Sequence, residues 1–376
     1  MKTHVYFPNL NGLRFIAAFL VILSHLEWIK MTEGMENYAS APFIKNLGSL
    51  GVSLFFVLSG FLISYLLLQE KKDTGDISIK NFYVRRILRI WPLYYITVIL
   101  AFFILPYFIS INGFGLEMFS GSYFTKLFFF SFLMANVSYS LYPIVPFASQ
   151  LWSVGVEEQF YLVWPLINKT FKKNFHKILI YIVLFIVSLR IVMELLYNTY
   201  PDNKMFYVIS FFLEHFRIQD MAIGGLAANI LFNKKELILR FLHSRDIEVI
   251  NLIATVVSVF SGMNYGVFNE EVYALFFVII IINAASNPNT ILKLEGKLFK
   301  FLGKISYGLY IYQILGIKLA VLFVFNYLSF KNDLYGNVVY YCVGTLITVA
   351  LASVSYFFIE IKFLSLKEKF SLVSSN

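Results

Sequence analysis

The segment NLNGLRFIAAFLVILSHLEW, residues 9–28, has the length and apolarity of a membrane-spanning helix, yet it contains an arginine and a histidine. A spanning helix needs about 20 predominantly apolar residues. Ionisable side chains inside such a helix are costly and usually mark a pathway or a reaction site. Arg14 and His25 are separated by about three helical turns, so both point to one face, ~16 Å apart along the axis. The structural alternative is a snorkelling arginine and a packed histidine.

Apolar runs of this length recur from end to end of the 376 residues. Hydrophobic residues make up 59% and charged residues 14% of the chain, whereas soluble domains contain about 25% charged residues. We therefore predict an all-α polytopic membrane protein. The first run is predicted to be a span and not a signal peptide, because Arg14 interrupts it and further spans follow. The single cysteine, Cys342, excludes an intramolecular disulfide and gives no basis for a metal site.

The apolar segments and the basic loops together predict the topology. The segments are 10–29, 47–69, 87–109, 124–140, 152–168, 176–198, 206–232, 247–263, 270–287, 300–327 and 337–361. Basic residues concentrate between alternate segments, at 71–89, 169–177, 234–245, 293–304 and 362–369, as cytoplasmic loops do. Two cytoplasmic loops must be separated by an even number of crossings, yet three segments lie between 89 and 169. We therefore predict about ten spans, both termini in the cytoplasm, and one re-entrant or tilted segment near 124–168, either 124–140 or 152–168. The net charge of +9 follows from these loops and does not indicate nucleic-acid binding.

The motif RRILRIWPLYY, residues 85–95, lies at the cytoplasmic end of the third segment. Arg86 and Arg89 are three residues apart and share a helical face. Paired guanidinium groups suit phosphate recognition, because each can bind two oxygens at once. Topology alone also predicts basic residues at the cytoplasmic end of a span. The arginine pair could therefore serve membrane orientation instead of binding phosphate.

The motif SQLWSVGVEEQFYLVWP, residues 149–165, places two adjacent acids in an aromatic, apolar run. Glu157 and Glu158 point ~100° apart on a helix, so at most one faces any given partner. Their counter-charges must come from elsewhere in the fold, or one acid must be protonated. Topology does not require buried acids, so this signal for a functional site is more specific than the arginine pair.

Several other features are predicted to be structural. The small residues Gly51, Ser59 and Gly60 are suited to close helix approach. Glu27 is expected at the membrane interface, and Lys318 is expected to be a solitary, snorkelling lysine. The chain contains no nucleophile elbow, phosphate loop, zinc-binding helix motif or dinucleotide fingerprint.

Taken in order, seven motifs resemble the integral-membrane acyltransferase family 3, bacterial proteins that O-acylate cell-surface glycans. They are NLNGLRFIAAFLVILSHLE, GVSLFFVLSGFLIS, YVRRILRIWPLYY, LWSVGVEEQFYLVWP, FRIQDMAIGGLAA, KISYGLYIYQILG and FFIEIKF, and they extend over about residues 8–363. The resemblance implies about ten membrane helices and a single acyltransferase domain over 1–376, with a short basic tail at 362–376. This chain departs from the family pattern at Asn11 (usually aspartate), Gln313 (usually histidine) and Lys362 (often proline).

The resemblance also implies roles for individual residues. It makes Arg14 and His25 essential, places the phosphates of acyl-coenzyme A at Arg86 and Arg89, and assigns conserved acids to Glu157, with Glu158 beside it, and to Glu360. Glu157 would orient His25 or pair with an arginine. His25 would act as general base on the acceptor hydroxyl or take the acyl group itself. Gln313 is assigned no proton transfer.

The implied partners are an acyl-coenzyme A donor, most simply acetyl-coenzyme A, a carbohydrate acceptor and membrane lipid, with no metal. The implied location is the bacterial inner membrane. Some relatives carry a hydrolase-like domain outside the membrane that these motifs do not include. Transfer to a glycan is therefore expected at the membrane or through a separate partner.

Two other classes of function stay open. A proton-coupled transporter or flippase for a glycan or lipid-linked intermediate would use His25 and the buried acids as a proton relay. A membrane sensor or scaffold would leave His25, Arg86 and Arg89 replaceable. The absence of internal repeats and the phosphate-sized basic cluster favour the enzyme. An acyltransferase binds acyl-coenzyme A and leaves esters on a glycan, whereas a carrier does neither.

Overall fold

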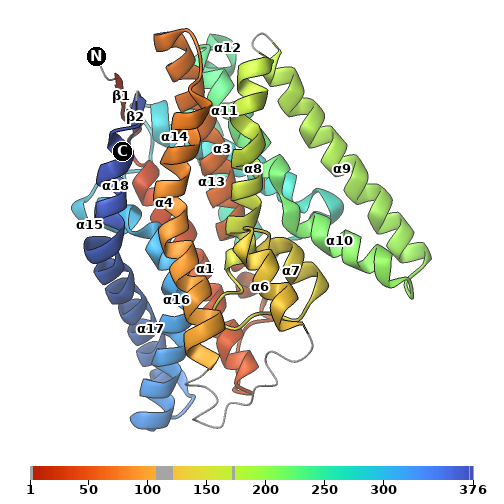
Figure 1. The fold of residues 1–376 in the computed structure, drawn as a ribbon, viewed down its shortest axis with the longest axis vertical. Coiled ribbons are helices and arrows are strands. Elements are labelled where there is room, and N and C mark those ends of the chain that lie inside the picture. The colour runs from red at the N-terminus through yellow and green to blue at the C-terminus, as the bar shows by residue number, and fades with distance from the viewer. Residues whose placement is uncertain (1–2, 107–121, 172–173, 372, 376) are drawn as a thin grey trace. The chain divides into compact units, whose positions relative to one another are not determined.

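The computed structural model describes residues 3–106, 122–171, 174–371 and 373–375, and nearly all of them are helical (Figure 1). The elements are β1 (Thr3–Val5), α1 (Leu10–Thr32), α2 (Pro42–Lys45), α3 (Leu47–Thr74), α4 (Ile79–Ile99), η1 (Leu100–Ile104), α6 (Tyr123–Ser131), α7 (Ala135–Leu141), α8 (Leu151–Thr170), α9 (Phe175–Thr199), α10 (Lys204–Phe216), α11 (Ile218–Phe232), α12 (Glu236–Leu242), α13 (Arg245–Phe260), η3 (Gly266–Phe268), α14 (Asn269–Ser286), α15 (Lys297–Lys304), α16 (Ser306–Val321), η4 (Leu322–Tyr327), α17 (Leu334–Ser355), η5 (Tyr356–Glu360), α18 (Ile361–Glu368) and β2 (Val373–Ser375). The end of the predicted segment 87–109 and residues 372 and 376 of the predicted tail lie outside the described residues.

The helices have the lengths that membrane crossing requires. Among the described residues, seven helices are long and apolar enough to span a bilayer: Leu10–Thr32, Pro42–Thr74, Ile79–Ile104, Phe175–Thr199, Gly266–Ser286, Ser306–Tyr327 and Leu334–Glu368. The prediction of an all-α polytopic membrane protein is confirmed, and the number of ten spans stays a prediction. The predicted segment 206–232 divides into α10 and α11 at Arg217, whose backbone is left-handed with φ 38°.

The predicted segment 124–140 is broken into two short helices. α6 has 9 residues and α7 has 7, and Leu133 between them has a positive φ of 61°. At 1.5 Å per residue these helices are about 14 and 11 Å long, too short for a hydrocarbon core of about 30 Å. By contrast, α8 runs unbroken for 20 residues. Of the two alternatives for a non-crossing segment, the structure therefore favours 124–140.

The chain packs as two compact units, each built from separate stretches of sequence. The first comprises Met1–Gly75, Asp220–Ile359 and Leu372–Asn376, and the second Asp76–Gln219 and Glu360–Ser371. In the first unit, α1 packs along α3 and α16, and α16 packs along α17. In the second, α4 contacts α8 and lies beside α18, and α9 and α10 form an antiparallel pair (Figure 1). The single domain expected from sequence stays a prediction.

The two ends of the chain pair in the first unit. β1 and β2 form a parallel ladder in which Thr3 is opposite Val373 and Val5 is opposite Ser375. Termini that pair must lie on the same side of a membrane. The pairing therefore agrees with an even number of crossings.

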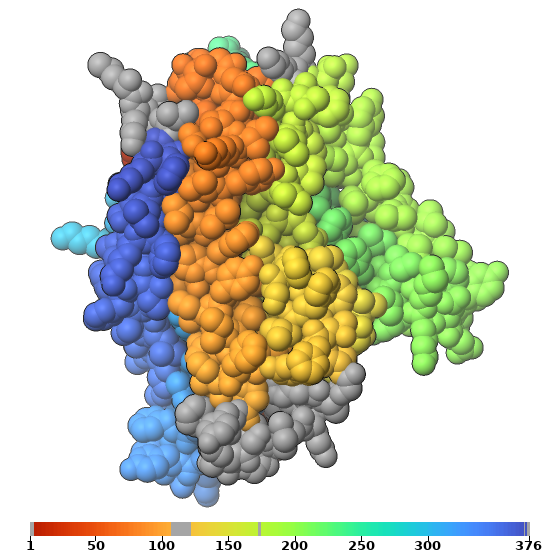
Figure 2. All heavy atoms as spheres, in the orientation of Figure 1, coloured from red at the N-terminus to blue at the C-terminus, as the bar shows by residue number. Residues whose placement is uncertain are grey.

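The second unit presents an apolar outer surface. Figure 2 shows α4 in orange and the α6–α7 pair in yellow as neighbouring parts of it. Phe124 and Phe128 of α6 and Phe132, the residue directly after it, are all exposed and recur every four residues, so they form one stripe along this segment. Large exposed aromatic side chains suit a surface that faces lipid.

Two glycines let α3 approach its neighbours in the first unit. A Cβ atom added at Gly51 would lie 2.6 Å from the carbonyl oxygen of Ala17 on α1. At Gly60 it would lie 2.0 Å from the carbonyl oxygen of Met221 on α11. The sequence prediction of close helix packing at Gly51 and Gly60 is confirmed.

We expect Gly60→Ala to destabilise the protein by about 1–3 kcal/mol, because the new methyl group overpacks a contact between two backbones. Thermal unfolding in detergent, followed by circular dichroism, measures the loss. Gly296→Ala is the matched control, since its Cβ would lie 3.9 Å from the nearest atom, on the Phe299 ring. Equal losses in the two variants would contradict the packing argument.

Candidate active site

The ring of His25 on α1 is held by the backbone of its own helix. Its Nδ1 lies 3.0 Å from the carbonyl oxygen of Val21. A carbonyl oxygen only accepts, so Nδ1 carries the proton of the neutral ring and Nε2 keeps a lone pair. The Trp28 ring lies edge-on at 5.8 Å. An unprotonated Nε2 on a part-buried, fixed ring is what a general base requires.

Gln313 lies on α16, which packs along the helix of His25. Its side chain is fully buried. The amide nitrogen of Gln313 donates to the carbonyl oxygen of Tyr310 at 3.0 Å. The amide oxygen has no hydrogen-bond partner among the described residues. Sequence reasoning noticed this position only as a departure from the family pattern.

Arg14 shares α1 with His25 near the other end of the span. The helix is continuous from Leu10 to Thr32, so the predicted arrangement of both side chains on one face, ~16 Å apart along the axis, is preserved. Arg14 Nη1 donates to Asn11 Oδ1 at 3.3 Å. Asn11 therefore still supplies an acceptor to the arginine, but without the charge of the aspartate usual in the family.

A buried ion pair follows the histidine on α1. Lys30 Nζ lies 3.1 Å from Glu27 Oε1, with side chains 1% and 0% exposed. Glu27 also accepts hydrogen bonds from the Tyr341 hydroxyl at 2.6 Å and from the backbone amide of Tyr38. Lys30 also donates to Asn337 Oδ1 at 2.7 Å. Glu27 is therefore buried inside the protein, and its expected depth at the membrane interface stays a prediction. The i,i+3 spacing of these two opposite charges is the sequence feature that could have predicted their ion pair.

The same end of α1 is tied to α16 by a second ion pair. Lys318 pairs with Glu33, which lies just beyond the end of α1. The expectation of a solitary Lys318 is therefore wrong, because its partner is distant in sequence. Asn332, just before α17, donates to the carbonyl oxygen of Glu36 at 2.8 Å. These contacts fix the helix that carries His25 to α16 and α17.

The second unit brings the predicted arginines and acids together. The Arg86 guanidinium lies 5.7 Å from the centre of the Phe82 ring and 5.6 Å from that of Tyr161. Its Nε is buried without a hydrogen-bond partner among the described residues. Glu157 and Glu158 of α8 are both close enough to act electrostatically on Arg86. In this unit Glu157 is therefore placed to pair with an arginine.

The other two acids have distinct environments in this unit. Glu158 Oε2 accepts a hydrogen bond from Trp91 Nε1 at 2.8 Å. Glu360, at the end of η5, acts electrostatically on Arg89. One oxygen of each acid is buried without a partner among the described residues. The cluster has fixed charges and unused hydrogen-bonding atoms, as a binding site for a charged ligand requires.

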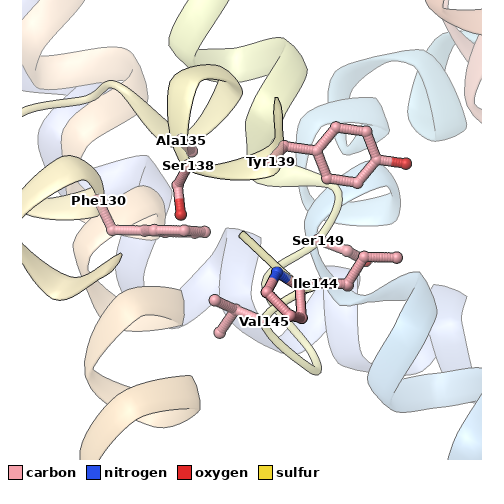
Figure 3. Close-up of a pocket in the computed structure, with 8 residues that line it drawn as sticks. Phe130, Ala135, Ser138, Tyr139, Ile144, Val145 and Ser149 are labelled. Carbon is pink, nitrogen blue, oxygen red and sulfur yellow. The ribbon is translucent and has the colours of Figure 1, made fainter. Parts of the chain in front are cut away.

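A small pocket lies elsewhere in the second unit (Figure 3). It is lined by Phe130, Ala135, Ser138, Tyr139, Pro143, Ile144, Val145 and Ser149, which come from α6, α7 and the segment before α8. Its cavity volume is about 10 Å³, far below the ~300 Å³ at which pockets for small molecules begin. It is therefore too small for a coenzyme.

Comparison with known proteins identifies the family. A protein-family model, described as the acyltransferase domain of the acyltransferase 3 family, matches residues 7–357. The chain belongs to the acyltransferase 3 family. Its relatives include the O-acetyltransferase OatA of Staphylococcus aureus strains NCTC 8325, COL and MRSA252, each 30% identical over 375 residues. The alignment covers 94% of this acyltransferase 3 chain and 57% of OatA, so the chain spans little more than half the length of these relatives. No solved structure matches.

Proposed function

We propose that this chain transfers an acetyl group from acetyl-coenzyme A to a hydroxyl of a cell-surface or exported glycan. Family membership supports acyl transfer, and the OatA relatives are named for O-acetyl transfer. The observation that carries the proposal is the state of His25, whose fixed tautomer leaves Nε2 able to take a proton from a hydroxyl. The enzyme would lie in the bacterial inner membrane with both termini in the cytoplasm.

The proposed reaction has a simple proton balance. The acceptor hydroxyl gives its proton to His25 Nε2, and its oxygen attacks the thioester carbonyl of the donor. The carbon–sulfur bond then breaks, and the leaving thiolate takes the proton back from His25. The products are an acetyl ester and free coenzyme A. Alternatively, His25 takes the acetyl group first and passes it to the acceptor.

Arg86 and Arg89 are proposed to bind the phosphates of the donor. Arg86 offers a buried Nε with no partner among the described residues and a guanidinium within cation–π distance of two aromatic rings, those of Phe82 and Tyr161. Such a group binds two phosphate oxygens at once, which an ammonium group does not. The neighbouring acids would offset the arginine charges when no donor is bound.

Arg86→Lys is therefore expected to raise the dissociation constant for coenzyme A about tenfold, because an ammonium group cannot bind two phosphate oxygens at once and a charge-assisted hydrogen bond is lost. Isothermal titration of the purified protein in nanodiscs measures the change. Arg240→Lys, on α12, is the matched control at an exposed arginine of another basic cluster. Unchanged affinity in Arg86→Lys would argue that the arginine pair serves topology only.

Transfer itself is tested in membrane vesicles that contain the chain and the envelope glycan of the host. Radiolabelled acetyl-coenzyme A is added to the cytoplasmic face, and alkali-labile label on the glycan is counted. Label that depends on the chain supports the acetyltransferase. No label on the glycan, together with chain-dependent movement of a glycan or lipid-linked sugar, would favour the transporter.

A further inference from the structure

Two hydrogen bonds fix how α4 and α8 pack in the second unit. The Tyr83 hydroxyl on α4 donates to the carbonyl oxygen of Leu162 on α8 at 2.6 Å. Trp91 Nε1, about two turns further along α4, donates to Glu158 Oε2 at 2.8 Å. Residue numbers rise along one helix while they fall along the other, so the helices are antiparallel. In the predicted topology α4 starts in the cytoplasm, so Glu158 lies deeper in the membrane than Leu162.

Two complementary polar atoms on this helix pair have no partner. Arg86 Nε, a donor, and Glu158 Oε1, an acceptor, are both buried without a hydrogen bond among the described residues. The Arg86 guanidinium lies 5.6 Å from the centre of the Tyr161 ring. Tyr161 shares a face of α8 with Glu158 and lies about 4.5 Å nearer the cytoplasm along the axis. Native proteins rarely leave such atoms unpaired, so they suit a ligand that offers an acceptor to Arg86 and, deeper in the membrane, a donor to Glu158.

Coenzyme A carries these groups in the required order. Its phosphate oxygens accept hydrogen bonds, and the pantetheine arm that leads from the phosphates to the thioester carries two amide N–H donors. A coenzyme that enters from the cytoplasm and serves a cell-surface glycan must direct its acyl end into the membrane. With a phosphate at Arg86, the arm and not the adenine then passes Glu158. Arg86, Trp91 and Glu158 are each only part-buried, so a ligand has access to them.

We propose that Glu158 is a binding residue for acetyl-coenzyme A, whose Oε1 accepts a hydrogen bond from an amide N–H of the pantetheine arm. The inference rests on the proposed function, because a phosphate at Arg86 sets the position of the arm. A carboxylate makes a charge-assisted bond, which is stronger than a bond between neutral groups. Glu158 thereby favours a ligand that carries the arm over a nucleotide that lacks it.

Trp91 makes Glu158→Gln a sharp test of this role. The indole N–H only donates, so in the variant the amide oxygen must face Trp91 and the NH₂ group replaces Oε1. The variant keeps the size of the side chain and its bond to Trp91. It presents a donor to the pantetheine N–H where the wild-type chain presents an acceptor.

Two ligands are titrated against the chain in nanodiscs: coenzyme A, and 3′-phosphoadenosine 5′-diphosphate, which lacks the arm. Loss of the Glu158 charge favours both anions alike, so the informative quantity is the ratio of the dissociation constant for coenzyme A to that for the nucleotide. Glu158→Gln should raise this ratio about 10- to 100-fold, as expected for a lost hydrogen bond to a charged group. Arg86→Lys should weaken both ligands and leave the ratio within about twofold, since both carry the phosphates.

Coenzyme A analogues in which CH₂ replaces one amide N–H identify the bond itself. One of the two analogues should bind the wild-type chain at least about tenfold more weakly than coenzyme A. The same analogue should show no such loss in Glu158→Gln, because the bond is already absent there. Equal losses in the two proteins for both analogues would overturn the contact.

The outcomes separate this inference from the proposed function. An unchanged ratio in Glu158→Gln, with coenzyme A still bound, would overturn the role of Glu158 and leave the acetyltransferase intact. A wild-type chain that binds the nucleotide as tightly as coenzyme A would do the same, since the arm would then add nothing. A wild-type chain that binds neither ligand would overturn the donor site at Arg86 and with it the proposed function.

Discussion

His25→Ala is expected to lower the rate of acetyl transfer by at least about 100-fold, the smallest contribution typical of a positioned general base. The structure supports this expectation because the ring is fixed through Val21 with Nε2 free of hydrogen. Binding of coenzyme A should be unchanged, since the proposed donor site is formed by other residues. The vesicle assay gives the rate, and titration with coenzyme A gives the affinity.

His215→Ala is the matched control for this prediction. Like His25, His215 is part-buried. Its Nδ1 lies 2.8 Å from the carbonyl oxygen of Phe211, four residues earlier on the same helix. Its ring packs against Tyr139 and Trp152, and we assign it no part in the reaction. Transfer should persist in His215→Ala. Equal loss in the two variants would mean that removing a packed histidine, and not removing a base, causes the effect.

Lys30→Met is expected to destabilise the protein by about 3–5 kcal/mol, because it leaves the carboxylate of Glu27 buried without its charged partner. Both side chains of this pair are almost fully buried, so water cannot replace the lost ammonium group. Titration with sodium dodecyl sulfate in mixed micelles, followed by tryptophan fluorescence, measures the change in the free energy of unfolding.

Two further variants make this prediction specific. The double variant Glu27→Gln/Lys30→Met removes both charges but keeps an acceptor for Tyr341, so it should recover most of the lost stability. Lys169→Met breaks an exposed ion pair with Asp76 and should cost less than about 1 kcal/mol. A loss in Lys30→Met no larger than that in Lys169→Met would contradict a buried ion pair.

Features encoded by neighbouring residues were predictable from sequence. The shared face of Arg14 and His25 follows from helical periodicity over one uninterrupted segment, and α1 preserves it. Parity of the basic loops predicted a non-crossing segment before α9. The choice between 124–140 and 152–168 needed the break at Leu133, whose left-handed backbone no pattern of apolar residues indicates.

Features that depend on packing between distant helices were not predictable from one sequence. The i,i+3 spacing of Glu27 and Lys30 was visible, but their burial depends on Tyr341 and Asn337, more than 300 residues away. The burial of Gln313 likewise depends on its own helix, α16, packing along α1. Sequence alone therefore found the reactive groups but not the residues that hold them.

The most direct measurement for the account is mass spectrometry of the envelope glycan from a host that expresses the wild-type chain, compared with His25→Ala at matched membrane levels. Cells are grown with ¹³C-labelled acetate so that new acetyl esters are recognised. We expect labelled, alkali-labile acetyl groups on glycan hydroxyls with the wild-type chain and their loss with His25→Ala. The same ester content in both strains and in a host without the chain would contradict it.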